Sequence, residues 1–96
     1  MLKYEYNAFT RKEKLLIRKE YFNIIKEDDL ACEVCSKNTK HYWVIVKKYA
    51  YEKYPVWLYH KHKKSDLYYH LHWKCYTVEQ AVKDIISHDD FVLKNR

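Results

Sequence analysis

The chain lacks glycine altogether and contains a single proline, Pro55. Loops that cradle phosphate groups need the backbone freedom of glycine, so the sequence excludes a P-loop and a glycine-rich dinucleotide site. Long apolar runs are also missing, because no stretch approaches the roughly 20 residues of a membrane-spanning helix. Residues 1–6 form no apolar signal core, which argues against secretion. A length of 96 residues predicts a single domain, residues 1–96.

Cysteine and arginine are both scarce, with three residues of each type. An odd number of cysteines is a poor disulfide framework and favours a reducing cytoplasm, where thiols stay free or bind metal. Lysine is far more frequent than arginine, and tyrosine and isoleucine are common where alanine is rare. This bias matches AT-rich codons, so we expect the gene to come from an AT-rich bacterial genome, a phage or a mobile element.

The positive charge is concentrated in the middle of the chain. The net charge is +6, and residues 37–64 contain eight lysines but only one acidic residue, Glu52. A localised basic surface indicates a polyanionic partner, of which nucleic acid is the first candidate. The alternative is a lysine-rich face that is merely solvated.

Hydrophobic periodicity predicts helices at both ends of the chain and strands between them. A capping box at Thr10 and Glu13 predicts a helix that runs to about Glu27. A second cap predicts an amphipathic helix from Thr77 to about His88. We therefore expect an α+β fold in which an N-terminal and a C-terminal helix flank a small antiparallel three-stranded sheet. Its strands are expected at residues 41–51, 56–62 and 67–73, with a short edge strand at residues 2–6.

Two close pairs of soft ligands suggest a structural zinc site. Thiolate and neutral imidazole are standard zinc ligands, and four of them close a tetrahedron. The expected ligands are Cys32, Cys35, His72 and Cys75. If the strand stays regular to Cys75, His72 points to the opposite face, so His70, His60 or His62 is an alternative fourth ligand. The other interpretation is that all three cysteines are reduced and bind no metal. A redox pair is disfavoured, because such pairs usually open a helix in a βαβ unit.

The two ligand pairs carry a resemblance to a known group of zinc-binding proteins. They read Cys32-Glu33-Val34-Cys35 and His72-Trp73-Lys74-Cys75, and a helix begins soon after the second pair. A cysteine knuckle, a hairpin and a second pair at the start of a helix resemble the treble-clef zinc fingers over residues 32–86. The chain departs from the group in having a histidine in the second pair and no glycine in the knuckle. The resemblance implies a zinc-stapled scaffold.

The same resemblance raises the possibility of catalysis. Treble-clef nucleases of the His-Asn-His type use a strand histidine as a base and helix residues as metal ligands, and His70 and His88 could play these parts. The sequence lacks the dense set of His and Asp that a catalytic metal would need. We therefore expect no enzymatic activity, and histidines that simply face solvent.

Lysines alternate with aromatic residues through the basic region. Lysines can neutralise phosphates and aromatic rings can stack on unpaired bases, so the pattern favours single-stranded DNA or RNA. Scarce arginine argues against bidentate recognition of guanine. The expected phosphate contacts are Lys47, Lys48, Lys61, Lys63 and Lys64, and the expected stacking residues are Tyr49, Tyr51 and Tyr59.

The sequence therefore predicts a non-enzymatic accessory module that binds nucleic acid, in a phage or mobile-element type of system. The alternative is a small protein that uses its aromatic face to bind and modulate a larger nucleic-acid-processing enzyme, because tyrosine and tryptophan also dominate protein interfaces. Binding through lysines should weaken steeply with salt, whereas an aromatic interface should not.

Overall fold

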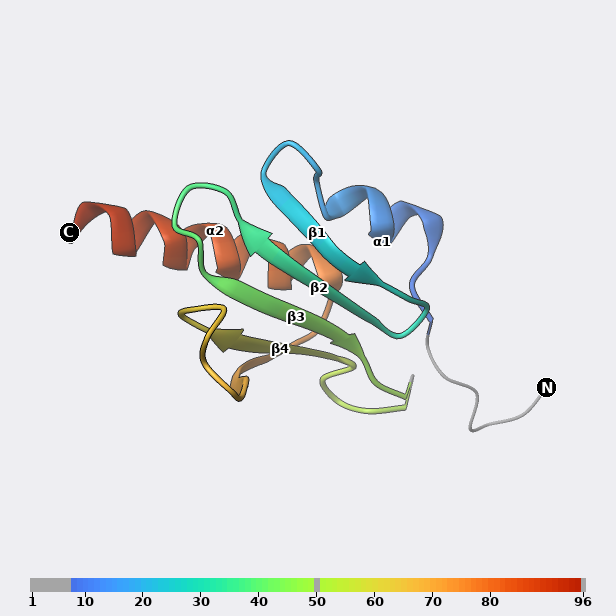
Figure 1. Ribbon diagram of the computed structural model, residues 1–96. Helices are drawn as coiled ribbons and strands as arrows, with labels where there is room; N and C mark the ends of the chain where they lie inside the picture. Colours follow the sequence, from blue (N-terminus) through green and yellow to red (C-terminus); the bar gives the residue numbers. More distant parts are fainter. Residues whose placement is uncertain (1–7, 50, 96) are drawn as a thin grey trace.

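The computed structural model describes residues 8–49 and 51–95 (Figure 1). The expected edge strand at residues 2–6 lies outside the described residues. The elements, in chain order, are α1 (Arg11–Leu16), β1 (Phe22–Glu27), β2 (Ala31–Ser36), β3 (Tyr42–Lys47), β4 (Val56–Lys61), β5 (His70–Cys75) and α2 (Val78–Lys94).

The strands form a single five-stranded antiparallel meander in the order β1-β2-β3-β4-β5. Both helices lie on the same face of this sheet (Figure 1). The α+β class is compatible with the prediction, but the predicted three-stranded sheet is wrong. Two further strands come from segments that were expected to form a helix end and a cysteine knuckle.

The first helix is shorter than expected. Thr10 and Glu13 do form the capping box, but α1 ends at Leu16 and a turn follows, in which the Phe22 amide donates to the Arg18 carbonyl at 2.9 Å. The segment expected to complete the helix is instead β1, paired with β2 along its whole length. Aromatic and β-branched residues such as Phe22 and Ile24 suit a pleated strand, and pairing with β2 overrides their weak helical pattern.

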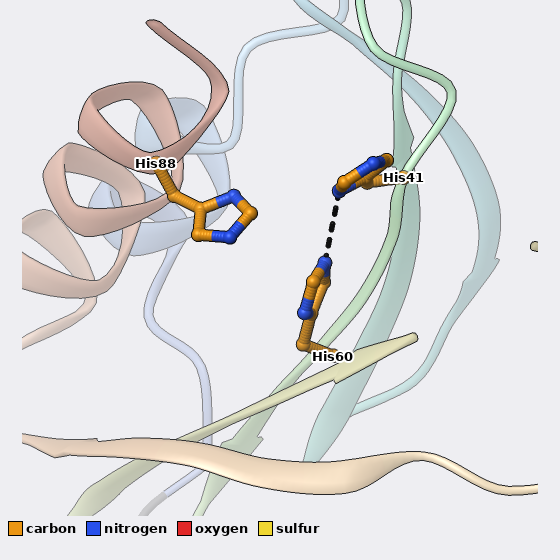
Figure 2. Close-up of side chains that lie close together, drawn as sticks. All are labelled: His41, His60 and His88. Carbon is orange, nitrogen blue, oxygen red and sulfur yellow. Dashed lines mark hydrogen bonds between the residues drawn. The ribbon is translucent and has the colours of Figure 1, made fainter. Parts of the chain in front are cut away.

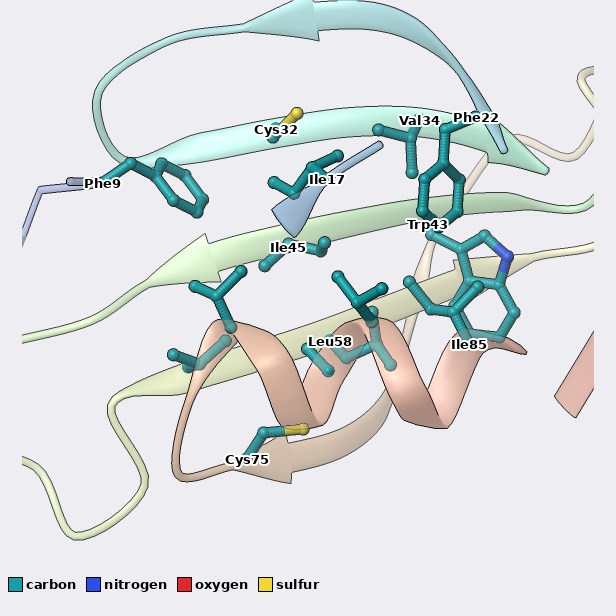
Figure 3. Packing of buried hydrophobic residues seen from close by; sticks show 14 residues of the cluster. Phe9, Ile17, Phe22, Cys32, Val34, Trp43, Ile45, Leu58, Cys75 and Ile85 are labelled. Carbon is teal, nitrogen blue, oxygen red and sulfur yellow. The ribbon is translucent and has the colours of Figure 1, made fainter. Parts of the chain in front are cut away.

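The core lies between the sheet and α2 (Figure 3). Thr77 caps α2 by accepting from the Gln80 amide, as predicted, and the helix continues beyond His88 to Lys94. The apolar stripe of α2 packs on inward-facing residues of β3 and β4, among them Trp43, Ile45 and Leu58. No helix in the described part of the chain is both long and apolar enough to cross a lipid bilayer.

Two local features shape the end of the sheet where the histidines lie. Lys40, directly before β3, has φ 65°, a left-handed conformation that glycine would adopt at lower cost. The β4–β5 register also shifts: Leu58 pairs with Trp73, whereas Tyr59 pairs with Leu71. His72 is therefore the extra residue of a β-bulge, a device that redirects a side chain.

Candidate metal centre and basic sheet face

All six histidines of the chain gather at one end of the sheet, on the face that α2 covers. His60 on β4 is the centre of the cluster and only 2% exposed. Its ring centre lies between 4.8 and 5.6 Å from those of the other five, His41, His62, His70, His72 and His88. One face of the His60 ring stacks on buried Trp43 at 4.0 Å. Four segments of the chain thus supply one imidazole cluster.

Three of these histidines converge closely enough to bind a metal ion. His41 precedes β3, His60 lies on β4 and His88 lies on α2, and their rings face one another (Figure 2). Their potential ligand atoms all lie within 4.8 Å of one another. His41 Nδ1 and His60 Nε2 are 3.0 Å apart, so one ring donates to the other. His88 Nδ1 is buried and has no hydrogen-bond partner among the described residues. Buried polar atoms normally have a partner, and a bound metal ion could fill that role here.

Burial and mutual repulsion favour the neutral form of three imidazoles of the cluster, His60, His72 and His88. Burial, reinforced by repulsion from His88 and His41, lowers the pKa of His60 to about 3. Burial and neighbouring histidines also lower the pKa values of His72 and His88. A neutral imidazole has a free lone pair, which is the form that binds metal ions.

A buried carboxylate holds two of the three ligand segments together. Asp89, fully buried on α2 beside His88, accepts hydrogen bonds from the Tyr21 hydroxyl at 2.6 Å and from the Thr39 hydroxyl at 2.9 Å. The Thr39 oxygen in turn accepts from the His41 backbone amide at 3.2 Å. This chain of bonds fixes the turn that carries His41 against the helix that carries His88. Nothing in the local sequence around Asp89 indicates this role.

The predicted Cys₃His set is not assembled. Cys32 and Cys35 lie in β2, which is paired on both sides and forms no knuckle. Cys75 lies in β5, and β3 and β4 separate the two strands. Neighbouring strands are about 4.8 Å apart, so roughly 14 Å lies between β2 and β5, whereas a zinc–sulfur bond is about 2.3 Å long. The cysteines are therefore not positioned for zinc. Of the four expected ligands only His72 lies in the histidine cluster, together with the alternative fourth ligands His60, His62 and His70.

Burial also disfavours the thiolate form of the cysteines in the metal-free chain. All three cysteines are free and buried. Burial, reinforced by nearby acidic side chains, raises the pKa of Cys32 to about 11 and that of Cys75 to about 12. The Cys75 thiol donates instead to Asp84 Oδ2 at 3.6 Å. Protonated thiols are poor metal ligands.

The opposite face of the sheet carries aromatic rings and lysines, and no described helix covers it. Lys48 and Lys74 place their Nζ atoms 4.6 and 4.2 Å from the centre of the Trp57 ring. Lys61 lies over two further rings, 5.5 Å from that of Tyr42 and 4.8 Å from that of Tyr69. We call this surface the basic sheet face; it comprises Tyr42, Lys48, Trp57, Tyr59, Lys61, Tyr69 and Lys74.

The predicted nucleic-acid residues divide between several places. Lys48, Tyr59 and Lys61 lie on the basic sheet face. Tyr49 and Tyr51 stack on each other at 5.3 Å in the connection between β3 and β4. The exposed loop between β4 and β5 carries Lys63 and Lys64.

Lys47 points the other way, into the interior. Its side chain is 3% exposed, and the ammonium group contacts both carboxylate oxygens of Glu13 at 2.7 Å. It is therefore not available to a phosphate. Sequence reasoning missed Tyr42, Trp57, Tyr69 and Lys74, although Trp57 shares a period-two pattern with Tyr59 and Lys61 that could have revealed it.

Comparisons with family models, with curated proteins and with solved structures find no match for this chain, so no zinc-finger family is identified.

Proposed function

We propose that the protein is a non-enzymatic module that binds nucleic acid, preferably single-stranded, through the basic sheet face. The observation that carries this proposal is the Trp57 ring with two lysine ammonium groups beside it, on a sheet face that no described helix covers. Aromatic rings stack on unpaired bases, with about 1–3 kcal/mol per base. A base that stacks on Trp57 would displace the lysines from the ring, and their long side chains would still reach the adjacent phosphates.

Neighbouring groups favour a path for the strand along β4 and β5. Lys61 extends the row of lysines toward the exposed loop that carries Lys63 and Lys64. Toward β2, the Glu33 carboxylate accepts a hydrogen bond from the Tyr69 hydroxyl at 2.6 Å, and its negative charge would repel phosphate. The positive potential of the face is therefore highest over β4, β5 and their connecting loop.

Anisotropy of a fluorescent single-stranded oligonucleotide, measured over a range of salt concentrations, tests the proposal. Two lost phosphate contacts should reduce the salt slope by about 1.4, because each contact on a single strand contributes about 0.7. The variant is Lys48→Ala with Lys74→Ala. Its matched control is Lys83→Ala with Lys94→Ala, which removes the same charge from the exposed surface of α2. Equal affinity and equal slope for the two double variants would refute the proposal.

A second candidate function is the binding and modulation of a larger nucleic-acid-processing enzyme, as in accessory proteins of phages and mobile elements. It is favoured by exposed apolar side chains beside the basic sheet face: Leu67 is 84% and Tyr68 is 82% exposed. An interface of this kind would be insensitive to salt. Replacing Leu67 and Tyr68 together by Ser should abolish capture of such an enzyme and leave oligonucleotide binding unchanged.

Zinc is the ion that we propose for the histidine centre. Imidazole nitrogen is a common zinc ligand. The filled d shell of zinc imposes no preferred geometry, so zinc readily takes a tetrahedral set of ligands. The buried, unpaired thiols fit a reducing compartment, and we propose the cytoplasm.

A further inference from the structure

The three converging rings already have the spacing of a zinc site. Zinc–nitrogen bonds of about 2.0–2.1 Å place the centres of tetrahedrally arranged imidazole ligands about 5 Å apart. The ring centres of His41, His60 and His88 are separated by 5.1, 4.8 and 5.6 Å. A metal ion could therefore replace the hydrogen bond between His41 and His60 with small side-chain movements.

Three further histidines lie near His60 and could take the fourth position. His70 is 5.5 Å from His60 between ring centres, but it is exposed, whereas the ring of His72 also contacts that of His88. His72 meets His60 and His88 at ring angles of 70° and 89°, with ring centres 5.6 and 5.3 Å away. His62 is more exposed and stacks on His41 with only 30° between the ring planes. Lone pairs lie in the plane of an imidazole ring, so a ring lying flat on its neighbour is poorly oriented to share a metal with it. His72, at the bulge of β5, instead lies on the helix-covered face, with its ring beside those of His60 and His88.

We infer that His41, His60, His72 and His88 form a closed, structural four-histidine metal site. The inference rests on the proposed zinc centre and deepens it, because it names the complete ligand set and its purpose. The four ligands join the turn before β3, strands β4 and β5, and helix α2, which are elements far apart in the sequence. A filled fourth position leaves none for an activated water, so the site stabilises the fold and performs no hydrolysis.

Polar groups around the cluster suit such a site. Asp84 lies with His72 and His88 along a cleft of about 600 Å³ between β5 and α2. A carboxylate in that position can accept the second ring N–H of a ligating histidine, which fixes its orientation. On the opposite side, the bond from the His41 amide to Thr39, and from Thr39 to Asp89, holds the His41 backbone.

Cobalt(II) titration of the metal-free full chain, followed by visible absorption and by competition with zinc, tests the ligand set. Four-coordinate cobalt absorbs strongly in the visible range, whereas higher-coordinate cobalt absorbs weakly. The wild type should bind one ion per chain and give the strong spectrum. His72→Gln should weaken binding by more than about 100-fold, since outer-shell partners alone contribute 10–100-fold, and should shift the visible spectrum, because a water would replace an imidazole. His70→Gln is the matched control, because His70 is an exposed histidine of the same strand.

The possible outcomes distinguish the four-histidine site from the zinc proposal and from nucleic-acid binding. Failure of the wild type to bind cobalt or zinc would overturn the zinc proposal and this inference together, and would leave nucleic-acid binding untouched. Metal binding that His72→Gln does not alter would overturn only the four-histidine set. A loss of affinity in His62→Gln or His70→Gln instead of His72→Gln would overturn it as well, and so would a near-ultraviolet thiolate-to-cobalt band. Circular dichroism of each variant verifies that the fold persists.

Discussion

The buried ion pair between Glu13 and Lys47 yields a quantitative prediction. It joins α1 to β3, with the Lys47 side chain 3% exposed and the Glu13 side chain 21% exposed. Removing one partner of a buried pair costs about 3–5 kcal/mol, because the other charge stays buried. Glu13 retains some contact with water, so we expect Glu13→Gln to lower the free energy of unfolding by about 2–4 kcal/mol. Glutamine can still make the capping-box bond to Thr10, so the variant isolates the loss of charge.

Urea denaturation followed by tryptophan fluorescence measures this change. The control is Glu79→Gln, which breaks an exposed pair with Lys83 of 3.9 Å and should cost no more than about 0.5 kcal/mol. Combining Glu13→Gln with Lys47→Met removes both charges and should recover most of the loss. The reasoning fails if Glu13→Gln is as mild as Glu79→Gln, or if the double variant is less stable than Glu13→Gln alone.

Four further predictions test other parts of the structure. Burial alone would raise the pKa of Glu13, but hydrogen bonds from Lys47 and Thr10 outweigh it and lower that pKa below 4.5. The stability that the ionised carboxylate contributes is therefore complete above about pH 4.5 and is lost as the pH falls through the lowered pKa, so acid titration of Glu13→Gln should lack this loss. Asp89→Asn should lower the free energy of unfolding by about 1–3 kcal/mol, because it weakens two charge-assisted hydrogen bonds, and an unchanged thermal midpoint would contradict this. Lys40→Gly should stabilise the protein by about 1 kcal/mol by relieving a left-handed backbone, and a lower urea midpoint would refute the assignment. A chromogenic thiol reagent should react with the native protein slowly and at the rate of unfolding, whereas rapid labelling would contradict the burial of Cys32, Cys35 and Cys75.

Local sequence patterns predicted some elements correctly and others incorrectly. The cap at Thr77 and the apolar stripe after it identified α2 because a long periodic segment fixes both type and face. The segment Phe22–Glu27 is too short for its hydrophobic pattern to distinguish a helix from a strand. Its hydrogen bonding to β2 makes it a strand. The spacing of Cys32 and Cys35 suited a knuckle, yet pairing of β2 on both sides extends that segment into a strand.

The histidine cluster was beyond local sequence reasoning for a related reason. Its six members come from four segments, and the register of the meander brings those of β4 and β5 together, for example by pairing His60 with His70. The i, i+2 repeats of histidine on two successive strands were a usable signal, because such residues share a face. The sequence offered His88 only as a helix ligand of a nuclease-type site, and its place in this cluster depends on where α2 crosses the sheet.

The order of the strands has a consequence for folding kinetics. Every strand pairs with its neighbour in the sequence, so the sheet can grow by successive hairpins, each closing only a short loop. Such hairpin pairs are local contacts, which favour fast folding. The histidines, by contrast, meet only when α2 docks on the end of the sheet, so a metal ion bound to them would oppose the undocking of α2 and slow unfolding.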